Sequence, residues 1–245
     1  MARALARGWS EPVLCSDSGS GRAAALAAEL GGRAVSNLEV AQAADLVVLC
    51  HKPYQLGPVA HEIAGHVKAV ASVLGSTNNG ALSKAYPGTP VFRLIPNTPV
   101  EVRQGVTCYA PYPPWNGYEI DHSLESQVLE LFGRLGSVIT IEERLLGVAS
   151  AVFSLGPAYQ ALVTEAQVDA AVRLGLTPGL ASQLVIETMS GTAALLTARD
   201  YDTLTVRREV TSPGGSTARG LDALERGGVR AAFSAAMDRV CEVAS

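Results

Sequence analysis

Short apolar runs alternate with helix-forming segments through the first half of this 245-residue sequence. The clearest run is DLVVLCHKP, residues 45–53, which is apolar almost throughout and ends at a proline. Such a run is typical of a strand that is buried on both faces of a parallel sheet. Strands that alternate with helices favour a doubly wound parallel sheet. We therefore expect an α/β domain over residues 1–144.

The pattern changes near Leu145, after which the sequence contains no convincing strand. Segments such as 156–176 and 178–198 are rich in alanine and apolar residues, and they have helical spacing. Long apolar helices with few aromatic residues more often form a buried interface than an independent small bundle. We therefore expect residues 145–245 to form an all-α dimerisation domain in a homodimer or a larger assembly of dimers.

Composition excludes several classes of protein. A formal net charge of only -4 provides no basic face for nucleic acid. No apolar run is expected to reach the roughly 18 residues that span a bilayer, and the N-terminus lacks a signal-peptide core, which predicts a cytoplasmic protein with no membrane partner. The four cysteines are scattered and the four histidines lack the spacing of metal ligands, so we expect free thiols and no metal site.

The ends of the predicted strands carry candidate cofactor residues, because ligands bind at the carboxyl edge of such sheets. Lys52 and Pro53 follow the apolar run, and Lys52 is either a phosphate or ribose contact or a solvated loop lysine. In SDSGSGR, residues 16–22, the serines and Arg22 favour a 2′-phosphate, whereas Asp17 favours a free ribose hydroxyl. The same serines could instead cap a helix. The pattern predicts NADPH or NADH as the cofactor.

Two turns with unusual composition follow. IPNTP, residues 95–99, holds Asn97 and Thr98 between prolines, as a ligand contact or as a structural turn. TSPGGST, residues 211–217, places two glycines and four hydroxyl side chains before a predicted helix. A helix N-terminus with free N–H groups binds carboxylates or phosphates. Simple helix capping is the alternative, but the paired glycines favour a ligand, since a cap alone needs no close backbone approach.

Four motifs in order along the chain carry a resemblance to a known family. They are HKP (51–53), FRLIPNTPVEVRQG (92–105), GPAYQALVTEAQVDAAVRLGL (156–176) and VTSPGGSTARGLDALERGGVRAAF (210–233). With these motifs the sequence resembles the pyrroline-5-carboxylate reductases over essentially its whole length. The resemblance implies a Rossmann domain, a helical dimerisation domain, and hydride transfer from NAD(P)H to 1-pyrroline-5-carboxylate in proline biosynthesis.

The resemblance also implies roles for individual residues. Ser212, Ser216 and Thr217 would hold the substrate carboxylate and ring nitrogen, with Thr217 as the catalytic hydroxyl beside the imine, and Glu143 would help to form the substrate site. The implied cofactor residues are Asn37 and the segment Cys50, His51, Lys52 and Pro53, beside the candidates Ser16 and Ser18. An imine carboxylate is therefore the expected small-molecule partner.

The sequence departs from the family pattern in three places. The family begins with a strand and a glycine loop, GxGxxxA, and Met1 aligns just after those glycines. We expect a chain made as written to bind the cofactor weakly, and about a dozen upstream residues encoding that strand and loop to restore binding. Phe153 and Leu155 stand where the family has serines, and Gly147 where it has an aspartate. Two other hypotheses therefore stand beside the reductase: a non-catalytic homo-oligomeric paralogue, and a reductase of another imine.

Overall fold

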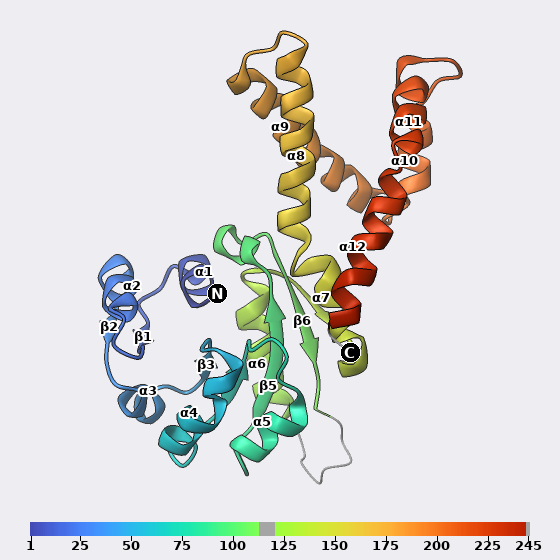
Figure 1. Cartoon of the computed structure of the whole chain (residues 1–245). Helices are drawn as coiled ribbons and strands as arrows, with labels where there is room; N and C mark the ends of the chain where they lie inside the picture. The colour runs from blue at the N-terminus through green and yellow to red at the C-terminus, as the bar shows by residue number, and fades with distance from the viewer. Residues whose placement is uncertain (113–120, 244–245) are drawn as a thin grey trace. The chain divides into compact units, whose positions relative to one another are not determined.

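The computed structural model describes residues 1–112 and 121–243 of the chain. The chain forms two compact units, Met1–Pro157 and Ala158–Ser245. The first unit contains the strands and the second is helical, which confirms the predicted fold class (Figure 1). The domain boundary expected after residue 144 stays a prediction.

The first unit alternates strands and helices in chain order. Its elements are α1 (Ala2–Trp9), β1 (Leu14–Cys15), α2 (Arg22–Leu30), β2 (Arg33–Ala34), α3 (Asn37–Ala43), β3 (Val47–Leu49), η1 (Pro53–Gln55), α4 (Leu56–Ile63), β4 (Val70–Ser72), α5 (Asn79–Ala85), β5 (Val91–Pro96), η2 (Thr98–Val102), β6 (Gly105–Ala110), α6 (His122–Gly133), β7 (Gly136–Thr140), η4 (Glu143–Leu145) and α7 (Leu146–Phe153). The sequence predicted neither β2 nor α5.

The described strands form two sheets. Strands β3-β4-β5-β6-β7 make one sheet in that order, and β1 pairs with β2 in a separate parallel pair. All neighbours are parallel except β5 and β6, which are antiparallel. A parallel crossover needs a dozen or more residues, and η2 is too short a connection to provide one. The expected sheet is therefore mixed in the part that the structure describes.

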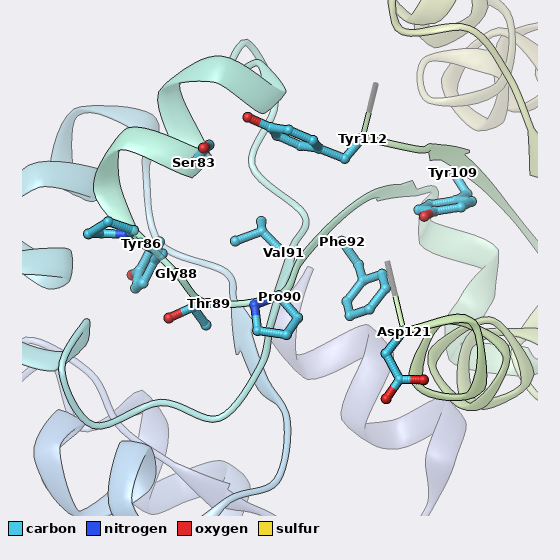
Figure 2. A pocket seen from close by; sticks show the side chains of 11 residues that line it. Ser83, Tyr86, Gly88, Thr89, Pro90, Val91, Phe92, Tyr109, Tyr112 and Asp121 are labelled. Carbon is cyan, nitrogen blue, oxygen red and sulfur yellow. The ribbon is translucent and has the colours of Figure 1, made fainter. Parts of the chain in front are cut away.

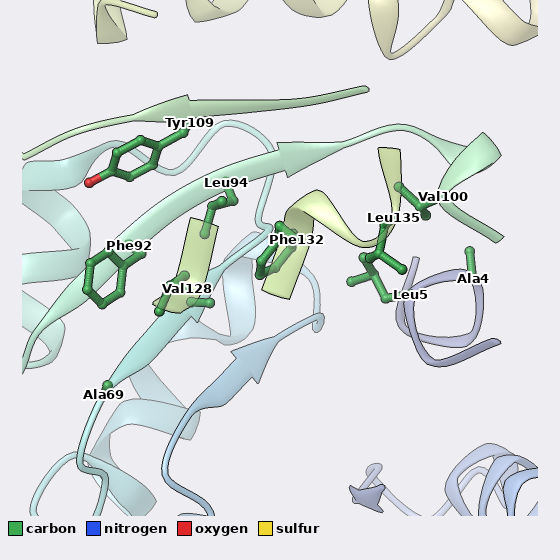
Figure 3. Packing of buried hydrophobic residues seen from close by; sticks show 11 residues of the cluster. Ala4, Leu5, Ala69, Phe92, Leu94, Val100, Tyr109, Val128, Phe132 and Leu135 are labelled. Carbon is green, nitrogen blue, oxygen red and sulfur yellow. The ribbon is translucent and has the colours of Figure 1, made fainter. Parts of the chain in front are cut away.

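Apolar side chains are buried on both faces of the larger sheet. One cluster joins α1 and α6 to β4, β5 and β6, with Leu5, Leu94 and Phe132 at most 1% exposed (Figure 3). A second cluster joins α3, α4 and α5 to β3 and β4. Ala71 belongs to the first cluster and Val70 to the second, as expected because successive strand residues point to opposite faces. The sheet is thus covered on both sides.

The second unit consists of helices. They are α8 (Gly156–Arg173, which begins at the end of the first unit), α9 (Pro178–Ala198), α10 (Thr203–Glu209), α11 (Ser216–Arg226) and α12 (Val229–Val243). Only Ala181 and Val206 are buried among the described residues after Pro157. Large apolar side chains such as Leu162, Leu174 and Leu184 are at least half exposed. This unit therefore presents much apolar surface.

One stretch passes a length-and-composition test for a membrane span, contrary to the expectation that no apolar run would. It covers Glu143–Arg173 and has a mean hydropathy of 1.4. The buried core helix of a soluble protein passes the same test, although only 11% of this apolar window is buried here, and a single stretch is weak evidence for a membrane. The structure also divides this stretch among η4, α7 and α8.

Candidate functional site

The loops after β1 and β2 bring two predicted cofactor residues together. The Ser16 hydroxyl donates to Asn37 Oδ1, and Asn37 Nδ2 donates to the Glu62 carboxylate over 2.7 Å. Asn37 begins α3 directly after Ser36, whose side chain and Glu39 form a capping box. These bonds link the ends of two strands to α4. The side chain of Ser18, the third predicted residue in this region, is exposed.

Asp17 is occupied by its own loop. Its carboxylate accepts from the backbone N–H groups of Gly19, Ser20 and Ala23 over 2.7–3.0 Å, and from the Ser20 hydroxyl. These bonds, the one from the Ala23 N–H first, lower the pKa of Asp17 to about 2. None of the serines caps α2, whose N-cap is Gly21, and Asp17 instead accepts from the Ala23 N–H in the first turn of that helix. Its carboxylate is not free to accept from a ribose hydroxyl.

The segment after β3 contains the other predicted cofactor residues. The Cys50 thiol is neutral, because burial raises its pKa to about 11. His51 Nδ1 lies 2.9 Å from the Lys52 carbonyl oxygen, so it carries the proton of that hydrogen bond, and Nε2 is buried without a partner among the described residues. The Lys52 N–H donates to Gln55 Oε1, while the Lys52 side chain and Pro53 are exposed. This segment starts η1 at the carboxyl end of the sheet.

Glu143, the predicted substrate residue of the first unit, has one carboxylate oxygen committed to the fold. Its Oε1 accepts from Arg93 Nη1 and from the Asn79 backbone N–H, each over 2.6 Å. Arg93 is 8% exposed, and burial lowers the pKa of its guanidinium while Glu143 opposes that shift. Only Oε2 is left for a ligand. Arg93 was not predicted from the sequence, although a lone arginine inside the apolar run VFRLIP signals a buried ion pair.

The IPNTP turn has a structural role at Asn97. Asn97 Nδ2 donates to the Phe153 carbonyl oxygen over 3.0 Å, and Asn97 Oδ1 accepts from the Val106 N–H over 2.8 Å. The Phe153 side chain packs on the apolar cluster formed around Ile95 and Leu146. Both polar groups of Asn97 thus hold the end of β5. This geometry favours the structural alternative over a ligand contact.

In the second unit, TSPGGST connects α10 to α11. Gly214 has φ 69°, and a Cβ built on Gly215 would come 2.5 Å from Ser212 Oγ, so both positions suit glycine. Gly215 is the N-cap of α11 and offers no side-chain cap. Ser212, Ser216 and Thr217 are all exposed on this loop and first turn. The backbone N–H groups and three hydroxyls can therefore donate to an anion.

The predicted site residues fall into two groups, one in each unit. Ser16, Ser18, Asn37, the segment 50–53 and Glu143 belong to Met1–Pro157, and Ser212, Ser216 and Thr217 belong to Ala158–Ser245. Each group is coherent by itself, and the roles implied for these residues stay predictions. Within residues 1–112 and 121–243, no three potential metal-ligating side chains gather, and the absence of a metal site stays a prediction.

A cavity of about 260 Å³ lies elsewhere in the first unit, where α5 ends and β5 begins (Figure 2). Tyr86, Phe92, Tyr109 and Tyr112 contribute aromatic side chains to it. The Tyr86 hydroxyl is buried without a partner among the described residues, and burial raises its pKa to about 12. None of the predicted site residues lines this cavity.

Two family models match the chain. The model described as pyrroline-5-carboxylate reductase dimerisation matches residues 143–245. The model described as NADP oxidoreductase, coenzyme F420-dependent, matches residues 1–79. The NADP oxidoreductase match lies within the part of the chain that contains the strands, and the dimerisation match begins at η4 and covers the helices that follow.

Individual relatives extend this match. The pyrroline-5-carboxylate reductase of Mycobacterium tuberculosis H37Rv is 35% identical over 229 residues, covering 82% of this chain and 76% of the relative. The enzyme of the same name from Synechocystis is 31% identical over 199 residues, covering 80% and 73%.

Solved structures show the same fold over nearly the full chain. The 1-pyrroline-5-carboxylate reductase of Streptococcus pyogenes superposes with a TM-score of 0.87 at 26% identity, covering 100% of this chain and 94% of that one. Pyrroline carboxylate reductase of Plasmodium falciparum with NADP bound gives 0.84 at 27% identity, covering 98% and 92%. This chain therefore belongs to the pyrroline-5-carboxylate reductase family of NAD(P)-dependent oxidoreductases.

Proposed function

We propose that this protein is a cytoplasmic homodimer that reduces 1-pyrroline-5-carboxylate to L-proline with NADPH. The observation that carries the proposal is the loop Ser212–Thr217, which offers hydroxyls and uncapped N–H groups at the start of α11. A cyclic imine carboxylate needs such donors for its carboxylate. The relatives that share this fold are named for the same substrate.

The residues of the first unit fit a phosphorylated dinucleotide. Asp17 is satisfied within its own loop, so its carboxylate does not compete for the ribose end of the cofactor. Ser16, Ser18, Asn37 and the segment 50–53 would hold the cofactor, and exposed Ser18 and Lys52 have donors to spare. NADPH supplies the hydride when it is bound. NADH is the alternative cofactor.

The protein would contribute positioning rather than covalent chemistry. Ser212, Ser216 and the α11 N–H groups would bind the carboxylate, while the Thr217 hydroxyl would bond to the ring nitrogen. Glu143 Oε2 would face the substrate from a carboxylate that Arg93 and Asn79 hold in place. A protonated imine accepts hydride readily, and alignment of the two reactants alone lowers the barrier by several kcal/mol.

The test is NADPH consumption by the purified chain with 1-pyrroline-5-carboxylate, followed by the loss of dihydronicotinamide absorbance and by chromatography of L-proline. We expect one proline to form for each NADPH consumed, at a low rate because the chain made as written is expected to bind the cofactor weakly. If NADPH is consumed with a different imine and not with 1-pyrroline-5-carboxylate, the proposed substrate is wrong but the protein is still an imine reductase. No consumption with any imine would exclude a reductase.

A second candidate is a homo-oligomeric protein that binds the cofactor weakly. It is favoured by the separation of the β1–β2 pair from the larger sheet, since the described strands leave one edge of β1 and one of β3 unpaired. Titration of the chain with NADPH, read by fluorescence, separates the candidates. Binding that becomes near micromolar when about a dozen upstream residues are added supports the reductase, and binding that stays near millimolar, about 4 kcal/mol weaker, supports the second candidate.

A further inference from the structure

Arg219, on the first turns of α11, folds back onto the loop that precedes its helix. Its Nη1 donates to the Gly214 carbonyl oxygen over 3.0 Å, and its Nη2 donates to Ser216 Oγ over 3.2 Å. One planar guanidinium therefore links the left-handed Gly214 to one of the three hydroxyls, Ser212, Ser216 and Thr217, that are proposed to hold the substrate. A lysine could not reproduce this contact, because the three donors of its ammonium share one nitrogen, whereas the guanidinium presents two nitrogens in a rigid plane.

The positive charge of Arg219 lies near the N-terminus of α11, where the helix dipole makes a positive charge unfavourable. Helix N-termini favour acidic side chains, and the first turn of α11 has none. Residues 210–221 contain no Asp or Glu. The next two acids, Asp222 and Glu225, pair with Arg226 and Arg230. A local choice that opposes the helix dipole in this way is expected where a site needs the charge.

The contact with Arg219 also determines what the Ser216 hydroxyl can do. A serine hydroxyl has one proton and two lone pairs. Because Ser216 Oγ accepts from Arg219, its own proton remains available to donate elsewhere, and the nearby positive charge strengthens that donation. Ser216 is thereby prepared to donate to an anion beside the N–H groups of α11.

We propose that Arg219 is a positioning residue that sets the affinity for the substrate carboxylate. It acts through Ser216, whose hydroxyl it holds as a donor, and through its positive charge at the loop. The inference rests on the proposed reduction of an imine carboxylate and names a determinant within that site. It predicts that the benefit of Arg219 depends on the carboxylate and not on the imine.

The experiment compares two substrates that differ only in the carboxylate. For 1-pyrroline-5-carboxylate, we expect Arg219→Ala to raise KM about tenfold or more, with kcat within about twofold of the wild type. For 1-pyrroline, which has no carboxylate, kcat/KM should change by less than about twofold. Arg219→Lys should fall between the wild type and Arg219→Ala, since it restores charge without the two-point contact.

Arg226→Ala is the matched control. It removes the same charge from the same helix, but its partner is Asp222 rather than the loop. We expect its KM for 1-pyrroline-5-carboxylate to match the wild type. An unchanged KM in Arg219→Ala, an equal rise in Arg226→Ala, or an equal loss with 1-pyrroline would each overturn the proposal. The last of these outcomes would mean that Arg219 supports only the shape of the loop.

Binding of L-proline tests the role of Arg219 independently of the proposed reduction. If the wild type fails to reduce the imine, the proposed function is wrong, and calorimetric titration of both proteins with L-proline still tests Arg219. Weaker binding to Arg219→Ala supports the carboxylate role. Equal affinity for both proteins, or no binding to the wild type, overturns it.

Discussion

The two units are built from similarly apolar sequence but bury it very differently. Met1–Pro157 contains three apolar clusters with side chains such as Phe132 and Leu94 fully enclosed. Among the described residues of Ala158–Ser245, only Ala181 and Val206 are buried. Helices that expose apolar residues on several sides are stable when another surface covers them. The first unit thus buries its apolar side chains within itself, whereas the second leaves apolar side chains exposed on a surface that we expect a partner to cover.

The largest effect should come from the core of the first unit. Phe132 is fully buried and its ring meets Trp9 edge to face, with centroids 5.5 Å apart. Phe132→Ala should lower the free energy of unfolding by about 3–5 kcal/mol, because it leaves a cavity in a packed cluster. Urea unfolding followed by tryptophan fluorescence measures this loss.

Val102→Ala is the control for that prediction, since Val102 is 68% exposed in the same unit. It should change the free energy of unfolding by no more than about 0.5 kcal/mol. Similar losses in both variants would mean that the first unit does not hold an independent core, and the contrast between the units would fail.

The second unit should respond through assembly. Leu184 lies on α9 and is half exposed in the single chain. If a second copy covers it, Leu184→Glu buries an unpaired charge and should weaken the dimer by about 2–4 kcal/mol. Analytical ultracentrifugation over a range of concentrations measures the change in dissociation constant.

Gln127→Glu, on the exposed side of α6 in the first unit, adds the same charge and should leave the dimer intact. A wild-type chain that is monomeric and folded at micromolar concentration would contradict the interpretation of the second unit as a dimerisation surface. So would a Leu184→Glu variant that dimerises as tightly as the wild type.

A third prediction compares what the two units bind. Thr217 belongs to the second unit, and its hydroxyl is proposed to meet the imine nitrogen. Thr217→Ala should raise the barrier to imine reduction by about 0.5–3 kcal/mol, the range for one hydrogen bond. NADPH affinity, measured by fluorescence, should change less. Equal losses in turnover and in cofactor affinity would place Thr217 at the cofactor instead.

Thr192→Ala provides its control. Thr192 lies on α9, and its hydroxyl donates to the Thr188 carbonyl oxygen within the helix. This variant also loses one hydroxyl from the second unit, and it should reduce the imine like the wild type.

Local sequence pattern explains how much of this architecture could be predicted. The run DLVVLCHKP reveals β3 because a doubly buried strand needs continuous apolar residues. Strand β2 is only Arg33–Ala34, both exposed, so no apolar pattern marks it. Strands β5 and β6 are antiparallel because the segment between them, which contains η2, is too short for a parallel crossover. The sequence pattern predicts a parallel sheet, because the alternation of strands and helices takes no account of the length of this connection.

The candidate site also contains a part that the sequence reveals and a part that only the structure reveals. The hydroxyls and glycines of TSPGGST are adjacent in sequence, so their common role at a helix start is visible without a structure. The partners of Asn97 and Glu143 are not adjacent to them. Asn97 meets Phe153, and Glu143 meets Arg93, across separations of 56 and 50 residues. Only the fold reveals that these polar groups are occupied by structural bonds.

The smallest predicted effect concerns Asp17, the exposed carboxylate whose hydrogen bonds hold the loop between β1 and α2. Its folded pKa of about 2 lies below the value of about 3.9 expected when the chain unfolds. A depressed folded pKa stabilises the fold above the unfolded pKa, and this contribution disappears as the pH falls through the folded pKa. Asp17→Asn should therefore be less stable than the wild type above about pH 4, and the two free energies of unfolding should converge as the pH approaches about 2. Unfolding in urea at a series of pH values measures the difference, with Asp45→Asn as the comparison, because among the described residues its exposed carboxylate bonds to Lys68 rather than to backbone N–H groups. A difference that stays constant down to pH 2 would mean that the carboxylate charge of Asp17 contributes nothing, and that the amide serves the loop as well as the acid.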